Sequence, residues 1–553
     1  MRSRRQSALW ATIILGATLL AGCSPEYYRR DADREVYGII ESKSDAVEGM
    51  PREIEEVEVD RPPVDPLQGA DRAPEEDIIP EEREPGAERP PLRIDLQRAL
   101  WVAAVNSRDY QDQREGLYFS ALDLTLERDA FEPLFFGTLA GQWDHDENDQ
   151  ESVSADSAFG FDRLLMTGGT ISAEVLTSLS QFLTGDPREA AGSLLSLTLA
   201  QPLLRDRGIA VTEPLTQAER DVYYEMRRFV RFQRTFFVGV YTEYFRVLES
   251  RQVLRNEVVN YENLTMALER AEAMAEAGRL PEFQVDQTRQ DVLSARDRLE
   301  RAQQRYHESL DSFKLTLALP TEAHITLELA ELKGLEEAEP TPLPYARDYA
   351  RQVALEQRLD LRTAEGQVVD TNRRVEVAIN RLRPGLDVVL QADTGTEENK
   401  PLKFAGYKNA YTAALELDLP LERTAERNTF RRRLIQAQAA LRDYEELRDT
   451  VVQQVRNRWR AYLRARRSYE IQRRSVDLAR SRVESTSMLL EAGRANTRDM
   501  LEAREALLGA RNALVQAVVD YKVARLELAR DMDILTVQKT GQMEANFSEY
   551  SPQ

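Results

Sequence analysis

Two acidic residues near the C-terminal end of the chain are spaced so that both could contribute to ion-selective rings. Asp499 and Glu502 lie three residues apart in an expected helix, so their carboxylates share one helix face. If several copies of the chain surround an axis, each of these residues becomes a ring of charge, and such rings select cations. A solvated helix face is the alternative interpretation, because 31% of the chain is charged.

The only cysteine of the chain indicates a second kind of chemistry, covalent acylation. Cys23 ends the sequence Leu20-Ala21-Gly22-Cys23, which follows a basic stretch at residues 2–5 and a mostly apolar stretch at residues 8–21. This order is typical of a bacterial lipoprotein signal peptide, here residues 1–22. It predicts cleavage before Cys23 and a lipid on its thiol. Because residue 24 is Ser and not Asp, we expect the outer membrane.

Patterns of catalysis and metal binding are not found in the sequence. The three histidines, His145, His307 and His324, have no partner at the spacing of a metal site or a catalytic triad. Gly168-Gly169 fits a loop and does not form part of a phosphate-binding motif. We therefore expect no enzyme activity, no metal and no cofactor other than the lipid. The net charge of −21 also argues against a nucleic-acid partner.

The region after the cysteine differs in composition from the rest of the chain. Residues 24–92 contain 10 of the 23 prolines, with 21 acidic and 9 basic residues. Such a segment has little apolar surface to bury and cannot offset its ordering entropy. We expect residues 23–92 to form an extended periplasmic tether, which can still lie against the folded body.

The remainder of the chain contains an internal repeat. Arg108-Asp109-Tyr110 matches Leu359-Asp360-Leu361 at an offset of 251, and Glu276–Arg279 matches Glu491–Arg494 at an offset of 215. Matches of this kind predict two copies of one structural unit. The copies cover residues 93–319 and 343–535, with a connection at 320–342 and a tail at 536–553. Because the offset falls, the first copy holds the larger insertion between its strands.

Each copy is expected to contain long helices that run antiparallel. Residues 424–492 contain no Pro and no Gly, and their apolar residues form a narrow stripe between charged faces. This pattern is typical of coiled-coil packing with water on one side. The long helices at 215–277 and 424–492 each end at Ala-Gly-Arg, where Gly is a favourable helix C-cap. A second helix then runs back over 282–319 and 497–535.

Four prolines mark the expected joints between helices and strands, because proline neither continues a helix nor donates to a central strand ladder. They are Pro133, Pro202, Pro384 and Pro420. The candidate strands are 134–142, 194–201, 386–393 and 410–419, and 170–183 is either an extracellular strand or a short helix. Residues 410–419 alternate between apolar and polar, as in a membrane barrel with a wet lumen.

These elements together predict a mainly α fold with a membrane β-barrel. Four strands cannot close such a barrel, since the smallest barrels have about eight strands. We therefore expect several chains to share one transmembrane β-barrel, continuous with a long α-helical barrel of coiled-coil helices. The repeated unit is expected to be helix–strand–strand–helix.

The chain resembles the TolC-like outer-membrane efflux proteins over residues 93–535. The matching stretches begin each copy, flank the strands and form the helix tips, and no single stretch is decisive without their order. They are Ile94–Leu100, Leu359–Glu365, Arg383-Pro384-Gly385-Leu386, Leu199–Arg205, and Glu491–Arg494 with Asp499-Met500-Leu501. The resemblance implies a homotrimer with a twelve-stranded barrel and a twelve-helix tunnel. It also implies a periplasmic adaptor protein and an inner-membrane transporter as partners, and a passive exit duct through the outer membrane.

The same resemblance assigns roles to residues near the helix tips. Asp499 and Glu502 match the acidic constriction of the family, and Asp286 is the counterpart in the first copy. Ala495 stands where the family often has a gate-locking arginine, and Arg494 or Arg498 can take its place. The turns with Gly278, Arg279, Gly493 and Arg494 would dock the adaptor hairpins. Glycine that only turns the chain is the alternative.

Two alternative functions stay open. The chain could be a structural coiled-coil lipoprotein of the envelope without channel activity, or a duct for type I protein secretion instead of small-molecule efflux. An adaptor is less consistent with the sequence, because adaptors have one helical hairpin among Gly-rich β-domains.

Overall fold

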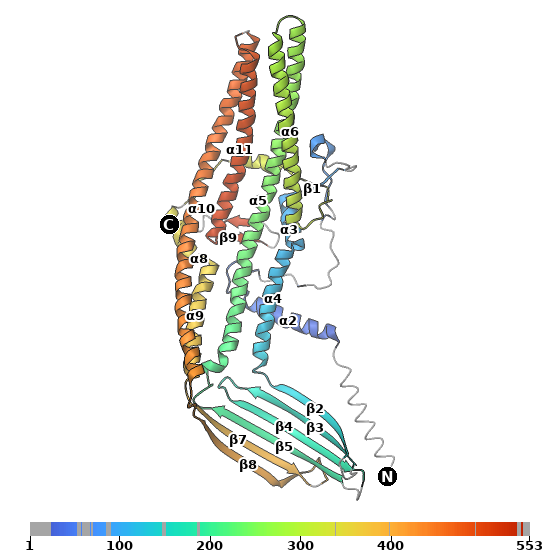
Figure 1. Cartoon of the computed structure of the whole chain (residues 1–553), viewed down its shortest axis with the longest axis vertical. Helices are drawn as coiled ribbons and strands as arrows, with labels where there is room; N and C mark the ends of the chain where they lie inside the picture. The colour runs from blue at the N-terminus through green and yellow to red at the C-terminus, as the bar shows by residue number, and fades with distance from the viewer. Residues whose placement is uncertain are drawn as a thin grey trace.

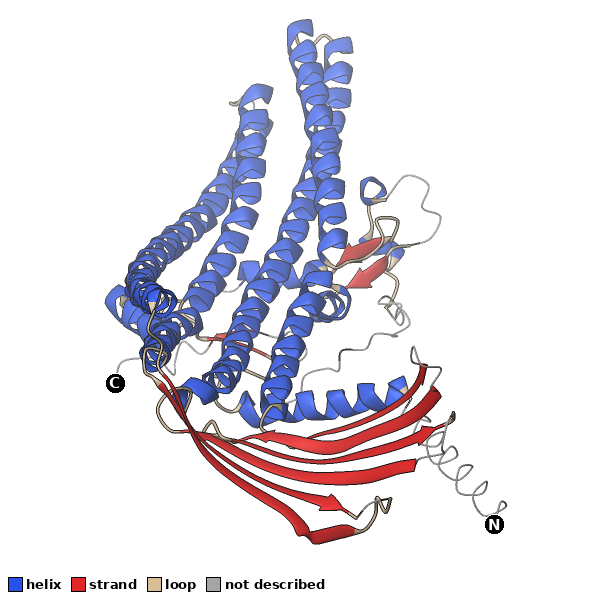
Figure 2. Ribbon diagram, turned by 60° about the horizontal axis from the view of Figure 1, so that its bottom comes forward, coloured by secondary structure: helices blue, strands red, loops and turns tan. Residues whose placement is uncertain are grey.

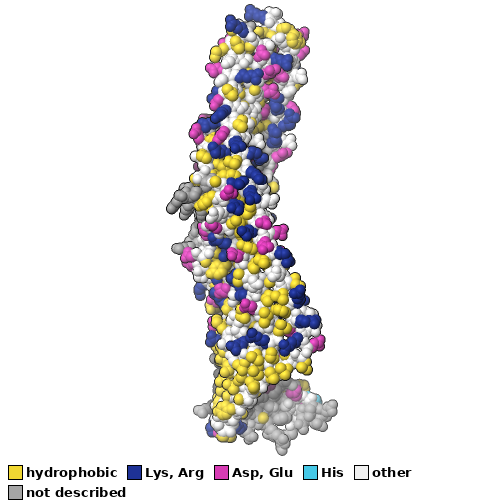
Figure 3. Space-filling view, turned by 90° about the vertical axis from the view of Figure 1, so that its left-hand side faces the viewer, with side chains coloured by type: hydrophobic (Ala, Val, Ile, Leu, Met, Phe, Trp, Pro, Cys, Tyr) yellow, Lys and Arg dark blue, Asp and Glu magenta, His cyan; other side chains and the backbone are white. Residues whose placement is uncertain are grey.

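The computed structural model is an elongated molecule with long helices at one end and a curved β-sheet at the other (Figure 1). It describes residues 24–51, 57, 67, 70–83, 90–145, 151–184, 189–337, 339–344, 346–397, 399–492, 494–538 and 543–545. Figure 3 shows hydrophobic side chains gathered at the sheet end, whereas basic and acidic side chains cover the helical part. No described helix is both long and apolar enough to cross a membrane.

The main helices of the two copies occur in the same order. The corresponding helices of the two copies have equal lengths of 11, 22, 68 and 35 residues. In the first copy they are α3 Leu96–Asn106, α4 Arg108–Asp129, α5 Ile209–Glu276 and α6 Glu282–Thr316. In the second copy they are α8 Arg347–Gln357, α9 Leu359–Asn380, α10 Thr424–Glu491 and α11 Thr497–Asp531. Their starts are offset by 251 for the first two pairs and by 215 for the last two.

The sheet is larger than the sequence predicted. It has six antiparallel strands in the order β2-β3-β4-β5-β7-β8. The strands are β2 Leu134–His145, β3 Glu151–Leu164, β4 Thr170–Phe182, β5 Glu189–Pro202, β7 Gly385–Thr396 and β8 Phe404–Asp418. The prediction of four strands was therefore wrong, because the first copy contributes four strands by itself. The extra strands β3 and β4 account for the fall in the repeat offset.

The two faces of the sheet differ in chemistry. Side chains that lie directly opposite each other on paired strands share a face. One row across all six strands is mostly apolar: Phe135, Phe161, Ala173, Leu197, Ala392 and Tyr411. A neighbouring row on the other face is mostly polar: Leu134, Asp162, Ser172, Thr198, Gln391 and Thr412. Phe135, Leu197 and Tyr411 are exposed to the surroundings.

The helices bury two hydrophobic clusters, and each contains residues of both copies of the repeat. The first joins α2–α6 and includes Val515 and Val519 of α11, and the second joins α8, α10 and α11 and includes Val238 of α5. The aromatic residues of α5 belong to the first cluster: the ring of Tyr110 lies 5.4 to 6.0 Å from the rings of Phe229, Phe232, Phe236 and Phe237. These aromatic residues therefore serve in packing between helices.

Part of the N-terminal tether has regular structure, which corrects the expectation of an extended segment. Residues Pro25–Ser44 form helix α2, which buries Val36, Ile39 and Ile40 against α4 and α5. Two short helices follow, η1 Glu75–Asp77 and η2 Pro80–Glu82. Composition alone did not indicate this packing, because the three apolar residues stand among many charged ones.

The connections between the main elements are also structured. Strand β1 (Leu92–Ile94) pairs in parallel with β6 (Ile325–Leu327), and α7 (Leu329–Glu337) follows. These elements lie in or beside the expected 320–342 connection and join the two copies. In the tail, β9 (Leu535–Val537) pairs with β10 (Met543–Ala545).

Candidate functional site

The four prolines lie where the helices meet the sheet. Pro133 and Pro384 come directly before β2 and β7, and Pro202 is the last residue of β5. Pro420 follows β8 by two residues. At these positions a missing amide hydrogen or a fixed φ costs little, because the strand ladder begins or ends there.

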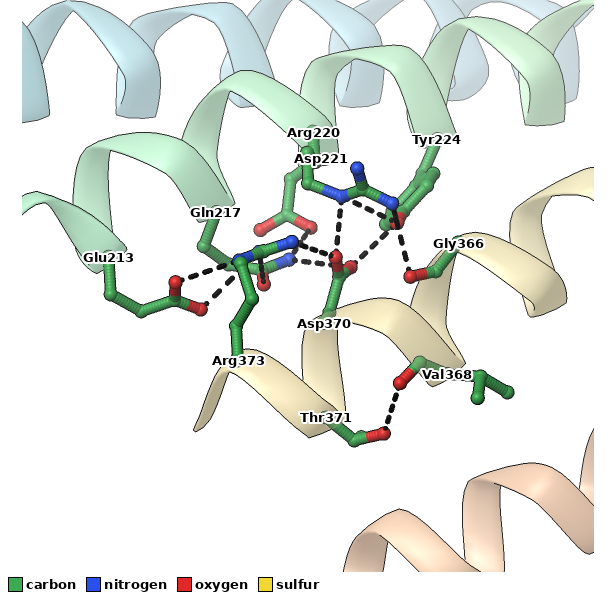
Figure 4. Close-up of polar contacts among 10 residues, drawn as sticks. All are labelled: Glu213, Gln217, Arg220, Asp221, Tyr224, Gly366, Val368, Asp370, Thr371 and Arg373. Atoms are coloured by element: carbon green, nitrogen blue, oxygen red, sulfur yellow. Dashed lines mark hydrogen bonds and ion pairs between the residues drawn. The ribbon is translucent and has the colours of Figure 1, made fainter. Parts of the chain in front are cut away.

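A buried polar network fixes α5 to α9 next to this joint (Figure 4). Asp370 is 2% exposed and accepts hydrogen bonds from Tyr224 Oη at 2.6 Å and from Arg373 at 2.8 Å. Its carboxylate also pairs with Arg220 Nε at 2.5 Å. Burial, and then the contact with Asp370, raise the pKa of Tyr224 to about 12. The tyrosine therefore stays a neutral donor, and the network holds two helices that lead into the sheet.

Asp533 joins three helices at a second point. Its carboxylate pairs with Arg231 at 2.9 Å and with Arg234 at 3.0 Å, and it accepts a hydrogen bond from the Leu359 amide at 2.8 Å. Asp533 and Arg234 are both almost fully buried. We missed this cluster in the sequence, because arginine and aspartate are usually solvent-exposed and no motif marks a buried pair.

The capping of α11 involves Asp499. The Asp499 amide donates to Asn496 Oδ1 at 2.9 Å, and Asp499 Oδ2 accepts from the Asn496 amide at 2.9 Å. This reciprocal pair is a capping box, which stabilises the first turn of a helix. The side chain is exposed, so its carboxylate remains accessible to water and ions.

Ion pairs lie near the predicted constriction on both helical hairpins. Glu502 accepts from Arg498 Nε at 3.1 Å on the same exposed face of α11. On α6, Asp286 pairs with Arg289 at 3.1 Å, and Arg289 also pairs with Glu272 of α5 at 2.8 Å. Within one chain the α5–α6 and α10–α11 hairpins separate toward their tips (Figures 1 and 2).

The two helix tips have matching backbone geometry. After α5, the Arg279 amide donates to the Met274 carbonyl at 2.8 Å, and after α10 the Arg494 amide donates to the Leu489 carbonyl at 2.8 Å. Gly278 has a φ of +69°, the left-handed conformation of a glycine C-cap. Arg279 and Arg494 are exposed. Gly493 and Cys23 lie outside the described residues.

Comparisons with known proteins agree with this architecture. Residues 350–531 match the family model described as outer membrane efflux protein. No curated protein sequence matches the chain significantly. Several solved structures have a similar fold, and each of those described next is an outer-membrane protein by name.

The structural similarity extends over most of the chain. The CmeC outer membrane channel of Campylobacter jejuni has a TM-score of 0.56 at 14% identity, with 82% of this chain and 88% of that chain covered. The outer membrane protein VceC of Vibrio cholerae has a TM-score of 0.56 at 12% identity, with 79% and 95% covered. The MtrE outer membrane channel of Neisseria gonorrhoeae, in its open state, has a TM-score of 0.54 at 14% identity, with 79% and 88% covered.

The fold and the family match define a protein with the architecture of an outer-membrane channel. The family model for outer membrane efflux proteins matches residues 350–531, which cover most of the second copy of the repeat. The resemblance predicted from the sequence is therefore confirmed.

Proposed function

We propose that three copies of this chain form the outer-membrane exit duct of a tripartite export system. The main observation in support of this proposal is the open six-stranded sheet, which has one apolar and one polar face. The outer edges of β2 and β8 pair with no other strand among the described residues. Unpaired backbone groups are too costly in lipid, so a membrane sheet must close on itself. Pairing β2 of one chain with β8 of the next closes the sheet.

The orientation of the faces follows from this closure. The apolar row with Phe135, Leu197 and Tyr411 would face lipid, and the polar row with Asp162, Gln391 and Thr412 would line the lumen. The long helices then continue the wall into the periplasm. Since no catalytic pattern is found in the sequence, the duct would conduct solutes passively, and the energy would come from an inner-membrane transporter.

The helix tips are the proposed contact with a periplasmic adaptor. Their two turns have the same hydrogen-bond pattern and end in exposed arginines. Three chains would present six such turns. Arg279 and Arg494 could donate to the free carbonyls at the ends of partner helices, where cations are favoured. Asp499 and Glu502 would form acidic rings beside them.

The lipid anchor is part of the same proposal. A lipid on Cys23 would attach the chain to the outer membrane, and α2 starts two residues later. Mass spectrometry of the mature N-terminus tests this point: an acylated peptide beginning at Cys23 supports it, and a peptide continuing upstream contradicts it. A Cys23→Ser variant should still insert, because the strands provide a second anchor.

Reconstitution in planar lipid bilayers tests the channel itself. The purified full-length protein should give discrete conductance steps. A structural coiled-coil lipoprotein would give none. Crosslinking from the tips in cells then identifies the partners: an adaptor with a proton-driven pump indicates small-molecule efflux, and one with an ATP-driven exporter indicates type I secretion.

A further inference from the structure

The hairpin β3–β4 is the largest departure of this chain from the expected repeat. The 251 and 215 offsets differ by 36 residues, and the described hairpin covers Glu151–Phe182 within that insertion. An insertion at this place can lie outside the membrane, inside the lumen, or in the wall of the barrel. Its pairing and its side chains distinguish among them.

The pairing places the hairpin in the wall. β3 pairs with β2 over twelve residue pairs, and β4 pairs with β5 over twelve. With 14 and 13 residues, β3 and β4 are as long as the other four strands, which have 12 to 15. The hairpin therefore separates β2 from β5 along their whole length, and neither a lumen plug nor an external loop would do so.

The side chains of the hairpin continue both faces of the sheet. On the face shared with Leu197, β3 and β4 have no charged residue between Val153 and Phe161 or between Ile171 and Leu179: the side chains there are Val153, Ala155, Ser157, Phe159, Phe161, Ile171, Ala173, Val175, Thr177 and Leu179. The opposite face has Asp156, Asp162 and Glu174, together with several serines. Carboxylates are disfavoured against lipid, so this face is the wet one.

The turn of the hairpin is built into the joint between sheet and helices. Thr167 Oγ1 donates to Gln201 Oε1 at 2.9 Å, and Gly168 has a φ of +91°. A Cβ on Gly168 would lie 2.4 Å from the Asp206 carbonyl oxygen, between β5 and α5. The turn thus lies at the same end of the sheet as the four prolines. β3 ends there and β4 begins there, at the level of the other strands.

We propose that β3–β4 is a wall hairpin that enlarges the shared barrel to eighteen strands and so admits bulkier solutes. The inference rests on the proposed trimeric channel. With a strand spacing of about 4.8 Å and a tilt of about 40°, twelve strands give a backbone diameter of roughly 24 Å and eighteen give roughly 36 Å. The exit through the membrane is then about 1.5 times as wide as the family resemblance implied.

The helical part fits the larger barrel. Four helices per chain meet the sheet, namely α4, α5, α9 and α10. Twelve helices at about 9 Å spacing have a perimeter of about 110 Å. Eighteen tilted strands have a perimeter of about 110 Å, and twelve have about 75 Å. The wall of the eighteen-stranded barrel therefore continues into the helical tunnel without a narrowing step.

Cysteine labelling tests the position of the hairpin. In a Cys23→Ser background no other cysteine is present. Single cysteines replace adjacent residues on opposite faces: Ala158 and Phe159 in β3, Glu174 and Val175 in β4, and Ser196 and Leu197 in β5 as the control. We expect the cysteines at positions 158, 174 and 196 to react with a water-soluble, membrane-impermeant maleimide. The cysteines at the other three positions should react only with a lipid-soluble maleimide.

The control strand β5 distinguishes a failure of the wall hairpin from a failure of the proposed membrane barrel. If β5 alternates while both faces of β3 and β4 react with the water-soluble reagent, the wall hairpin is wrong and the channel stands. If β5 does not alternate either, the proposed membrane barrel fails as well.

A deletion tests the width. Removing residues 147–182 leaves residue 146 and residues 183–188 between β2 and β5, as many as the seven residues 397–403 that connect β7 and β8. A cysteine at Thr412 on the lumen face reports entry of polyethylene glycol maleimides of graded size from outside the cell. The largest polymer that reacts should be about 1.5 times wider in the intact chain than in the deletion variant. An equal limit, or a wider one after deletion, would overturn the proposal. If the deletion variant fails to insert, the cysteine labelling pattern still tests whether β3–β4 lies in the wall of the barrel.

Discussion

At the scale of single residues, the most buried charged groups differ from the acidic residues that the sequence made prominent. Asp533 and Asp370 are almost fully buried and bind several donors, and they hold helices together. Asp499, Glu502 and Asp286 also have partners, but their carboxylates are exposed to water and ions.

Asp533→Asn should destabilise the protein strongly. Asparagine keeps the shape and tolerates the positive φ of +58° at this position, but removes the charge that balances Arg231 and Arg234. Breaking a buried ion pair costs about 3–5 kcal/mol, because the remaining charge stays buried. Thermal denaturation in detergent measures the change. Asp286→Asn is the control, since its side chain is 68% exposed and should cost less than about 1 kcal/mol. Equal stability of the two variants would contradict the assigned role of Asp533.

Neutralising the exposed pair at the tip should reduce cation selectivity. Asp499→Asn with Glu502→Gln keeps an acceptor for the Asn496 amide and for Arg498 while removing six charges from a trimer. Reversal potentials in asymmetric salt across planar bilayers measure the effect. The matched control is Asp297→Asn with Glu300→Gln on α6, which has the same spacing and similar exposure. If both double variants retain the selectivity of the unaltered protein, Asp499 and Glu502 lie on an outer surface.

At the scale of elements, the long helices were predictable and the sheet was only partly so. The ends of α6, α10 and α11 lie within four residues of the predicted limits, because long stretches without Pro and with a regular apolar stripe favour one continuous helix. Helix α5 begins at Ile209, six residues before the predicted start, because it continues through Pro214. For β2, β5, β7 and β8, the ends that prolines mark lie within one residue of the prediction, whereas the other ends extend three to six residues further.

Strand β3 was missed for a physical reason. Its positions on the polar face of the sheet are Ser, Asp, Ala and Gly, and its opposite face includes Ala155 and Ser157, so the apolar alternation is weak. The regularity becomes visible only when each residue is compared with its partner on β2 and β4. The polar networks around Asp370 and Asp533 were missed because they join residues more than 140 positions apart.

The tips should be sensitive to bulk and not to the loss of glycine itself. Gly278→Trp with Gly493→Trp should abolish transport, because large side chains would block the approach of an adaptor, whereas the barrel and trimer stay intact. Gly278→Ala with Gly493→Ala introduces backbone strain of about 1 kcal/mol at the positive φ of Gly278 but no bulk, and should retain transport. Transport assays in cells, with adaptor crosslinking, measure both.

A second control checks that tryptophan alone is not harmful. Gly334 in α7 is exposed, and a Cβ there meets nothing within 4 Å. Gly334→Trp should leave transport unchanged. If the tip tryptophans are also tolerated and crosslinking persists, coupling does not run through the tips.

At the scale of the whole molecule, the proposed function requires several copies of the chain. Its sheet is open, its apolar face is exposed, and its two helical hairpins separate toward their tips (Figure 2). A closed barrel removes the strand edges and gives the apolar face to lipid. The eighteen-stranded barrel, the acidic rings and the ring of six tips all depend on this assembly.

The native mass of the detergent-extracted protein tests this central claim most directly. Native mass spectrometry of the mature, full-length protein should give a complex of three times the protomer mass, with no stable smaller species. A membrane-inserted monomer, or a complex with a different number of chains, would contradict the shared barrel.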